Sequence, residues 1–153
     1  MEAKFLLFRV DNDKYLIDIQ KVHSLIQKEP GEIREIPNGP KFVAGMSSLR
    51  DKAILVIDAR LLFGKSTFIT EKYTIIMLKK GDSSDCGIIV DEVSSVMQVD
   101  ESDIQSKDSS LLNSSLAEGV VLMNKEIYLM IDPSKIINDN IEKFLESQRQ
   151  MHN

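Results

Sequence analysis

The feature that most constrains this chain is a repeat within its own sequence. The segment 45–63, GMSSLRDKAILVIDARLLF, aligns without a gap with 119–137, GVVLMNKEIYLMIDPSKII. Gly45 meets Gly119, and apolar residues coincide at 46 with 120, at 49 with 123, and over 54–57 with 128–131. The repeat predicts two small β subdomains, each a strongly bent antiparallel sheet. The alternative is a chance likeness between two short apolar segments.

Each copy of the repeat has an apolar strand that ends in Ile-Asp, and a short helical-looking turn follows. Asp58 and Asp132 stand directly before these turns, where a carboxylate accepts N–H bonds from the first residues of a helix. Pro133 occupies the favoured first helical position of the second copy. We therefore predict that both aspartates are helix caps. The preceding segments, 15–25 and 87–97, match more loosely, residue for residue from their first positions.

Most of the remaining chain alternates apolar runs with polar turns, which is typical of strands and hairpins. Strands are predicted at 4–10, 15–19, 73–80 and 86–93. Residues 100–118 are rich in Ser and Asp and predict a long polar connection. Only NDNIEKFLESQRQ, 138–150, predicts a longer helix, because its apolar residues recur at i, i+3 and i+4. Its apolar stripe indicates docking on the chain's own barrel or on a partner.

Composition excludes several classes of protein. The 153 residues suit one domain, and a net charge of −5 without a clustered basic run argues against nucleic-acid binding. A single cysteine excludes an internal disulfide and a multi-cysteine zinc site. The longest apolar runs, AILVI and IYLMI, are far shorter than the roughly 20 residues that cross a bilayer. A soluble, cytoplasmic protein is the expectation.

Residues that carry chemistry are scarce. Neither His23 nor His152 has a second ligand at metal spacing, and Cys86 stands beside apolar GIIV, which favours a small core residue over a reactive thiolate. GMSSL lacks the second glycine of a nucleophile elbow, and no phosphate-binding glycine loop is present. We predict a protein that is not an enzyme, with no catalytic residues, metal or cofactor.

Arg50 is the residue in the repeat that invites a functional interpretation. It stands between two apolar runs, at a hairpin-like break that it shares with Asp51. Its planar fork of five donors is able to bind backbone carbonyls or acceptors of a partner, and we expect it to face a groove between the two halves. The alternative is a solvated turn charge, paired at most with Asp51.

The chain resembles the CheW family of bacterial chemotaxis coupling proteins. The motifs that carry the resemblance are FLLFRVDNDKYLIDIQKVHSLI, IREIPNGPKFVAGMSSLRDKAILVIDARLLFG, CGIIVDEVSSVMQVDESDI and EGVVLMNKEIYLMIDPSKI. They run from Phe5 to about Ile137. The resemblance implies a mainly β fold of two intertwined five-stranded, SH3-like barrels with short helices. On this basis 1–153 is expected to be one CheW-like domain of two barrel subdomains, roughly one per half, with exchange of strands or termini.

The resemblance also implies a function and site residues. CheW proteins are non-enzymatic adaptors that join the cytoplasmic tips of transmembrane chemoreceptors to the regulatory domain of the histidine kinase CheA, and so lie in the cytoplasm at receptor arrays. Leu49 and Arg50 match the family's Leu-Arg pair, which is tied to receptor coupling. Gly45 and Gly87 match glycines whose substitution impairs coupling, and Val22 matches a valine of the receptor groove.

Two departures from the family pattern concern partner binding. Asp51 stands where the family usually has glycine, and Ser24 stands where many members carry glutamate. These departures leave open a CheW-like scaffold for a non-chemotactic kinase pathway. A small β-barrel that binds a small molecule between its two halves is the remaining alternative.

Overall fold

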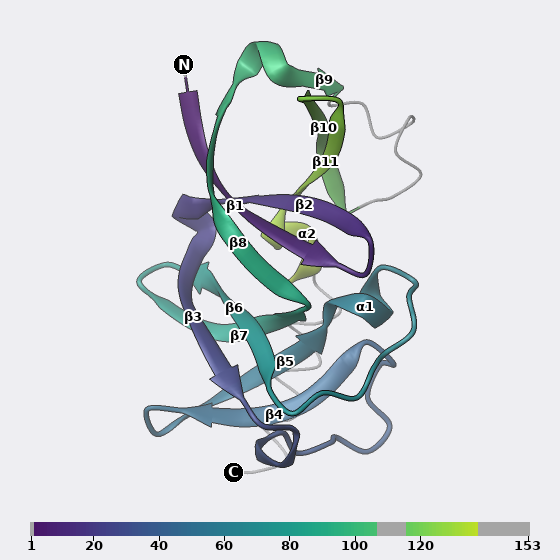
Figure 1. Cartoon of the computed structure of the whole chain (residues 1–153). Coiled ribbons are helices and arrows are strands. Elements are labelled where there is room, and N and C mark those ends of the chain that lie inside the picture. The colour runs from purple at the N-terminus through teal and green to yellow at the C-terminus, as the bar shows by residue number, and fades with distance from the viewer. Residues whose placement is uncertain (1, 107–115, 138–153) are drawn as a thin grey trace.

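Strands that are apolar on both faces decide how this chain assembles. In the computed structural model, residues 2–106 and 116–137 are described, and strands dominate them (Figure 1). The strands are β1 (Glu2–Val10), β2 (Asp13–Asp18), β3 (Val22–Lys28), β4 (Val43–Leu49), β5 (Lys52–Asp58), β6 (Tyr73–Lys80), β7 (Ser83–Val90), β8 (Glu92–Asp100), β9 (Ile104–Ser106), β10 (Ala117–Met123) and β11 (Glu126–Ile131). Two α-helices of one turn each, α1 (Ala59–Leu62) and α2 (Pro133–Ile136), and three 3-10 turns, η1 (Ile19–Lys21), η2 (Pro30–Glu32) and η3 (Glu101–Asp103), complete the described part.

The strands form two mixed sheets. One has five strands in the order β3-β6-β7-β5-β4, and the other has six in the order β8-β1-β2-β11-β10-β9. Neighbouring strands are antiparallel except for β5 with β7 and β11 with β2, which are parallel. The prediction of purely antiparallel sheets was therefore wrong for one strand pair in each sheet. The five-stranded sheet uses a continuous stretch of chain, whereas the six-stranded sheet combines the N-terminal hairpin with strands from the second half. Figure 1 shows the six-stranded sheet above the five-stranded one.

Three apolar clusters explain why consecutive positions in the strands are apolar. The central cluster lies between the two sheets, and each sheet has a further cluster on its other face. In β5, for example, Leu55 and Ile57 belong to the central cluster, while Ile54 and Val56 belong to the cluster of the five-stranded sheet. Since successive side chains of a strand point to opposite faces, a strand buried on both faces needs an unbroken apolar run.

The five-stranded sheet curls until its two outer strands approach each other. The ammonium of Lys28, at the end of β3, donates to the carbonyl oxygen of Ser48 in β4 at 2.6 Å. A short bridge between Arg34 and Met46 adds two backbone hydrogen bonds of 2.8 Å to the free edge of β4. The predicted mainly β fold of two barrel-like subdomains with few helices is confirmed, with β9 as an additional short strand.

The repeat found in the sequence is present in three dimensions. Gly45 pairs with Val56 next to a bulge in β4, and Gly119 pairs with Met130 next to a bulge in β10. The turns that follow also correspond, because Arg50 and Asp51 have φ of 49° and 63°, and the turn residues 124 and 125 have φ of 52° and 65°. Two consecutive residues with positive φ are typical of the type I′ turns that join tightly twisted hairpins.

The looser part of the sequence alignment was wrong by one residue. It matched Tyr15 with Gly87, but Tyr15 pairs with Leu129 in the same way that Cys86 pairs with Leu55. The following strands then correspond as well, since both β3 and β8 have a bulge near their start, around His23 and Ser94. Runs of similar apolar residues hold too little information to fix such a shift.

Three other expectations need revision or lie outside the described residues. The predicted strand 86–93 is broken at Asp91, where the chain leaves the five-stranded sheet and β8 joins the other one. The predicted connection 100–118 begins with η3 and β9 and ends within β10, and its residues 107–115 lie outside the described ranges. The predicted C-terminal helix at 138–150 also lies outside them.

Candidate functional site

The turn between β4 and β5 presents Arg50 to solvent. Arg50 and Asp51 are both exposed, and no described residue forms a hydrogen bond or ion pair with the guanidinium. Figure 1 places the free end of the β4–β5 hairpin at the lower left, away from the six-stranded sheet. The expectation that the turn faces a groove between the two halves was therefore wrong. A tightly twisted two-residue turn carries the hairpin tip beyond the sheet rather than back toward its neighbour.

Strand β3 forms an outer edge of the five-stranded sheet and carries two of the predicted partner-binding residues. Val22 is half-buried against the central cluster, and Ser24 is half-buried just after the bulge. Between them and the end of the strand lies Leu25, whose side chain is 49% exposed. Because β3 pairs only with β6, its other edge offers backbone groups to a partner.

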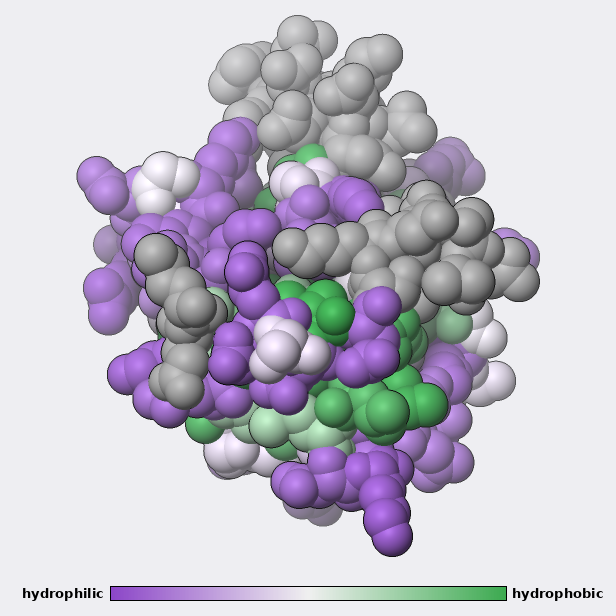
Figure 2. Space-filling model, turned by 90° about the horizontal axis from the view of Figure 1, so that it is seen from above, coloured by the Kyte–Doolittle hydropathy of each residue, from purple (hydrophilic) through white to green (hydrophobic). Residues whose placement is uncertain are grey.

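Strand β8 repeats this arrangement at the edge of the six-stranded sheet. Val22 and Val93 correspond through their pairing with Leu78 and Phe8, so Val96 takes the place of Leu25. Val96 is 50% exposed, close to the value for Leu25. Most of the surface in the view of Figure 2 is hydrophilic, and its apolar side chains gather in a limited area. The two repeats thus each expose one large apolar side chain at the same place of an edge strand.

The structure does not bring all the predicted site residues together. Lys28, which contacts Ser48, lies at the end of β3 nearest the Arg50 turn. Val22 lies at the opposite end of β3, six residues away, which corresponds to about 20 Å of strand. Leu49 is half-buried at the end of β4 and packs against the cluster of the five-stranded sheet. These residues therefore lie along one side of the five-stranded subdomain rather than in one pocket.

Gly45 and Gly87 are buried, so neither touches a partner through the surface. A Cβ atom at Gly45, where φ is +151°, would collide with the backbone carbonyl of Arg34. A Cβ atom at Gly87 would lie 2.6 Å from side-chain atoms of both Ile75 and Met77. Any effect of these glycines on partner binding has to act through the packing of the five-stranded sheet.

Both predicted caps are confirmed. The N–H of Arg60 donates to Asp58 Oδ1 at 2.9 Å, and the N–H of Ser134 donates to Asp132 Oδ1 at 3.0 Å. Asp58 accepts a further bond of 2.8 Å from the hydroxyl of Thr67, which ties the loop after α1 to the cap. The two copies thus share the cap and differ in what surrounds it.

Sequence reasoning missed a bidentate, largely buried ion pair between Arg60 and Asp91. Arg60 Nε and Nη2 donate to the two carboxylate oxygens of Asp91 at 2.8 and 2.6 Å. Burial raises the pKa of Asp91, but hydrogen bonds from Arg60 and from the backbone N–H of Asp11 outweigh it and hold that pKa below its usual value. The available signal was the charge of Asp91 directly after the apolar run CGIIV.

The described residues offer little for catalysis. His23 Nδ1 lies 2.9 Å from Ser24 Oγ, but His23 is exposed in a bulge, and no third described group orients the ring. Cys86 is fully buried, as predicted for a core residue, and desolvation raises its pKa to about 12. Within 2–106 and 116–137, no three His, Cys, Asp or Glu side chains form a group that fits a metal ion. An exposed His-Ser contact between sequence neighbours lacks the third group that orients the base in a nucleophilic site.

A groove of about 600 Å³ lies on the five-stranded subdomain, between the segment 30–44 and the loop after α1. Its walls are mixed, with apolar Ile33, Leu61 and Phe68 beside polar groups, and the carboxylate of Asp58 in its wall is already bonded. The space between the two sheets is filled by the central cluster. The small-molecule alternative had placed its ligand there.

In the described parts of the chain, each α-helix is one turn long, and none approaches the length that spans a bilayer.

Comparison with known proteins adds sequence and fold relatives. A family model described as the CheW-like domain matches residues 4–140. The chemotaxis protein CheW of Klebsiella aerogenes is 23% identical over 151 residues, which covers 97% of this chain and 90% of that protein. CheW of Thermotoga maritima is 25% identical over 138 residues, with 90% and 89% covered. The crystal structure of the scaffolding protein TtCheW from Thermoanaerobacter tengcongensis matches with a TM-score of 0.73 at 28% identity, and covers 86% of this chain and 90% of that one.

Proposed function

The chain belongs to the CheW-like family of chemotaxis scaffold proteins, and on this premise we propose that it is a non-enzymatic adaptor that couples chemoreceptors to the histidine kinase CheA. The observation that carries the proposal is a family match over nearly the whole chain together with a scaffold protein of the same fold. The adaptor works in the cytoplasm, at receptor arrays that it joins through its partners. The chain acts as one CheW-like domain, 1–153, whose two subdomains share the central cluster.

We place the receptor-binding surface along β3 and the turn that follows β4. This β3 surface consists of Val22, Ser24, Leu25 and Arg50, and the hydrogen bond from Lys28 to β4 joins its two ends. Leu25 supplies exposed apolar area, and Arg50 supplies donors that no described residue uses. Arginine is enriched among the residues that contribute most to protein interfaces. The regulatory domain of CheA binds a different face.

The departure at Asp51 fits this assignment, because the turn keeps its shape. Asp51 adopts a φ of 63°, and aspartate tolerates this region better than most residues that have a side chain. Arg50 is therefore presented on a type I′ turn although the usual glycine is missing. Ser24 in place of glutamate removes a charge from the surface, so the receptor tip that binds here need not offer a cation at that point.

Two substitutions of Arg50 test whether its side chain contacts the receptor or whether only the shape of the turn matters. We expect Arg50→Ala to weaken binding of the receptor's cytoplasmic tip at least roughly 30-fold, since a central interface arginine contributes about 2 kcal/mol or more and about 1.4 kcal/mol is tenfold. CheA binding should change less. Arg50→Asn places at this position a residue that tolerates positive φ, and it should weaken receptor binding by the same factor. Titration of each variant with purified receptor tip and with purified CheA measures the two affinities.

The other hairpin provides the matched control. Asn124 occupies the same place in the β10–β11 turn as Arg50 does in β4–β5, with a φ of 52°. Asn124→Ala perturbs an equivalent turn without removing an arginine and should leave receptor binding unchanged. Receptor binding that survives both Arg50 substitutions would show that Arg50 is only a solvated turn charge. An equal loss of receptor binding in Asn124→Ala would show that the conformation of the turns matters, and not the side chain of Arg50.

Leu25 gives an independent test of the same surface. We expect Leu25→Ala to weaken receptor binding, and Leu122→Ala, which removes a similarly exposed leucine from β10, to leave it unchanged. Binding to a different kinase and no chemoreceptor would favour the scaffold of a non-chemotactic pathway. Pull-down from native cells distinguishes these two results.

A further inference from the structure

The central cluster holds the two sheets together through apolar contacts. It consists of apolar side chains from both sheets, and attraction of this kind is proportional to area and has no direction. Buried area by itself therefore contributes little to the choice of one relative angle. A defined angle requires contacts with geometry, such as hydrogen bonds and ion pairs.

A group of charged residues supplies such contacts at one place. We call it the polar corner, and it consists of Arg9, Asp11, Asp13, Arg60, Lys65 and Asp91. At its centre the bidentate Arg60–Asp91 pair is largely buried, with 18% and 5% of the two side chains exposed. Paired N–H···O bonds to one carboxylate fix orientation as well as distance.

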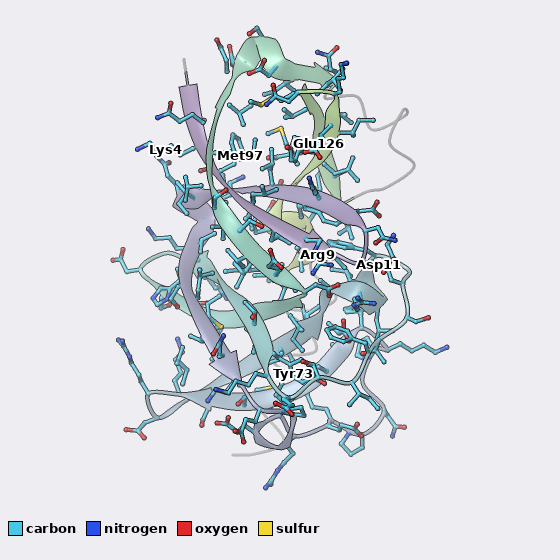
Figure 3. The ribbon with its side chains drawn as sticks, viewed as in Figure 1. Lys4, Arg9, Asp11, Tyr73, Met97 and Glu126 are labelled. Atoms are coloured by element: carbon cyan, nitrogen blue, oxygen red, sulfur yellow. The ribbon has the colours of Figure 1, made fainter. Side chains whose placement is uncertain are left out.

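The polar corner crosses from one sheet to the other. Arg60 belongs to α1, which continues β5 of the five-stranded sheet, whereas Asp11 belongs to the β1–β2 turn of the six-stranded sheet. The N–H of Asp11 donates to Asp91 Oδ2 at 2.8 Å, so one carboxylate binds both sides. A second link joins Lys65, in the loop after α1, to Asp13 in β2 at 2.6 Å. Figure 3 shows Arg9 and Asp11 at the end of this hairpin, beside α1.

In the described part of the second repeat, the residues that correspond to Arg60 and Asp91 carry no charge. Ser134 takes the place of Arg60 in α2, and Gln20 takes the place of Asp91 before the following edge strand. Within the described residues, the charged contact there is a single pair between Lys21 and Asp132 at 3.5 Å. Among the described residues, the charged contacts between the two sheets are therefore concentrated at the polar corner.

We propose that Arg60 and Asp91 are positioning residues that fix the angle between the two sheets, and with it the relative placement of the edge strands β3 and β8. This inference rests on the proposed function in one respect, that these strands present Leu25 and Val96 to a partner. The physical basis is independent of the partner, since β8 begins one residue after Asp91. Without the corner, the central cluster still holds the sheets together but permits them to rotate against each other.

The test is a distance between the two edge strands in the isolated protein. Spin labels at Gln27→Cys in β3 and Gln98→Cys in β8, both exposed, are measured by double electron–electron resonance on a Cys86→Ala background. The parent should give one narrow distance distribution. Arg60→Ala and Asp91→Asn should each broaden it and shift its mean. A distribution that stays as narrow, at the same mean, in both folded variants overturns the proposal.

Two further variants serve as a control within one sheet and as a replacement for central variants that do not fold. Lys14→Ala removes an ion pair of 2.7 Å to Glu126 that lies within the six-stranded sheet, and it should leave the distribution unchanged. Equal broadening by this control would overturn the positioning role. Should the central variants not fold, Lys65→Met removes the outer links to Asp13 and Asp11 and keeps the Arg60–Asp91 pair, and broadening is again expected. An unchanged distribution in that variant then counts against the proposal.

Failure of the positioning inference can be told apart from failure of the proposed function. The distance is measured without receptor or kinase, so it reports only on the sheets. A corner that controls the distance in a chain that binds no receptor supports the inference and refutes the adaptor assignment. If the protein binds receptor through Leu25, but the distance between the labels in β3 and β8 is unchanged in the polar-corner variants, the adaptor assignment is supported and the inference is refuted.

Discussion

Replacing Gly45 with alanine tests how the repeat glycine supports the fold. Gly45 is buried beside the bulge of β4, and its backbone has a φ of +151°, where residues with a side chain are strained. An added Cβ would collide with the carbonyl of Arg34, which is backbone and has no rotamer that moves it away. The variant therefore has to displace the segment that runs along β4.

The size of the effect follows from what that displacement breaks. The Arg34 segment is held by two hydrogen bonds of 2.8 Å with Met46, and each contributes about 1 kcal/mol. A strained backbone conformation adds about 1–3 kcal/mol. We expect Gly45→Ala to lower the free energy of unfolding by about 3–5 kcal/mol. For a domain of this size, that corresponds to a melting temperature lower by about 10 °C.

Gly64 offers the matched control. It has a φ of +78°, but no atom lies within 4 Å of the position of an added Cβ. Gly64→Ala therefore carries the backbone strain without the collision and should cost about 1–2 kcal/mol. Urea denaturation of both variants gives the two free energies of unfolding. If Gly45→Ala costs no more than Gly64→Ala, the collision with the Arg34 carbonyl is not what requires glycine.

Three further predictions concern the caps, the buried carboxylate and the thiol. Asp58→Ala should cost about 2 kcal/mol by denaturation and Asp132→Ala about 1 kcal/mol, since Asp58 also accepts a hydroxyl hydrogen bond. Because the pKa of Asp91 is lower in the folded protein, its contribution is present above the unfolded value near pH 4 and is lost as the pH falls further. Acid titration of stability should therefore be shallower for Asp91→Asn than for the parent. Cys86, with a pKa of about 12, should react with a thiol reagent at pH 8 only after unfolding, and fast reaction of the native protein would contradict its burial.

The sequence by itself determined the local features, because each depends on residues close together in the chain. Asp58 and Asp132 cap helices through the second N–H that follows them, so the Ile-Asp pattern was sufficient to predict both. Tyr73–Lys80 was predicted as a strand with the bounds that β6 has. The gapless repeat likewise predicted two equivalent hairpins, since bulge and turn depend on spacing within one copy.

Family resemblance, more than residue chemistry, carried the prediction of function. It named the scaffold class, which the comparisons support, and pointed to Arg50, Val22 and Ser24, which the structure leaves as predictions. Spacing alone gave no means to tell that Gly45 and Gly87 are buried or that the Arg50 turn extends away from the other sheet.

Only the tertiary structure decided which strands share a sheet and where the two sheets are locked together. The N-terminal hairpin joins the second repeat through a parallel pairing of Tyr15 with Leu129, more than a hundred residues apart. Apolar strands of similar composition can pair in several ways, and burial against the complete set of neighbours selects one. For the same reason, the residues near Arg60 in the sequence do not predict its ion pair with Asp91. That bond exists only because the sheets, once packed, bring α1 to the point where the chain crosses from one to the other.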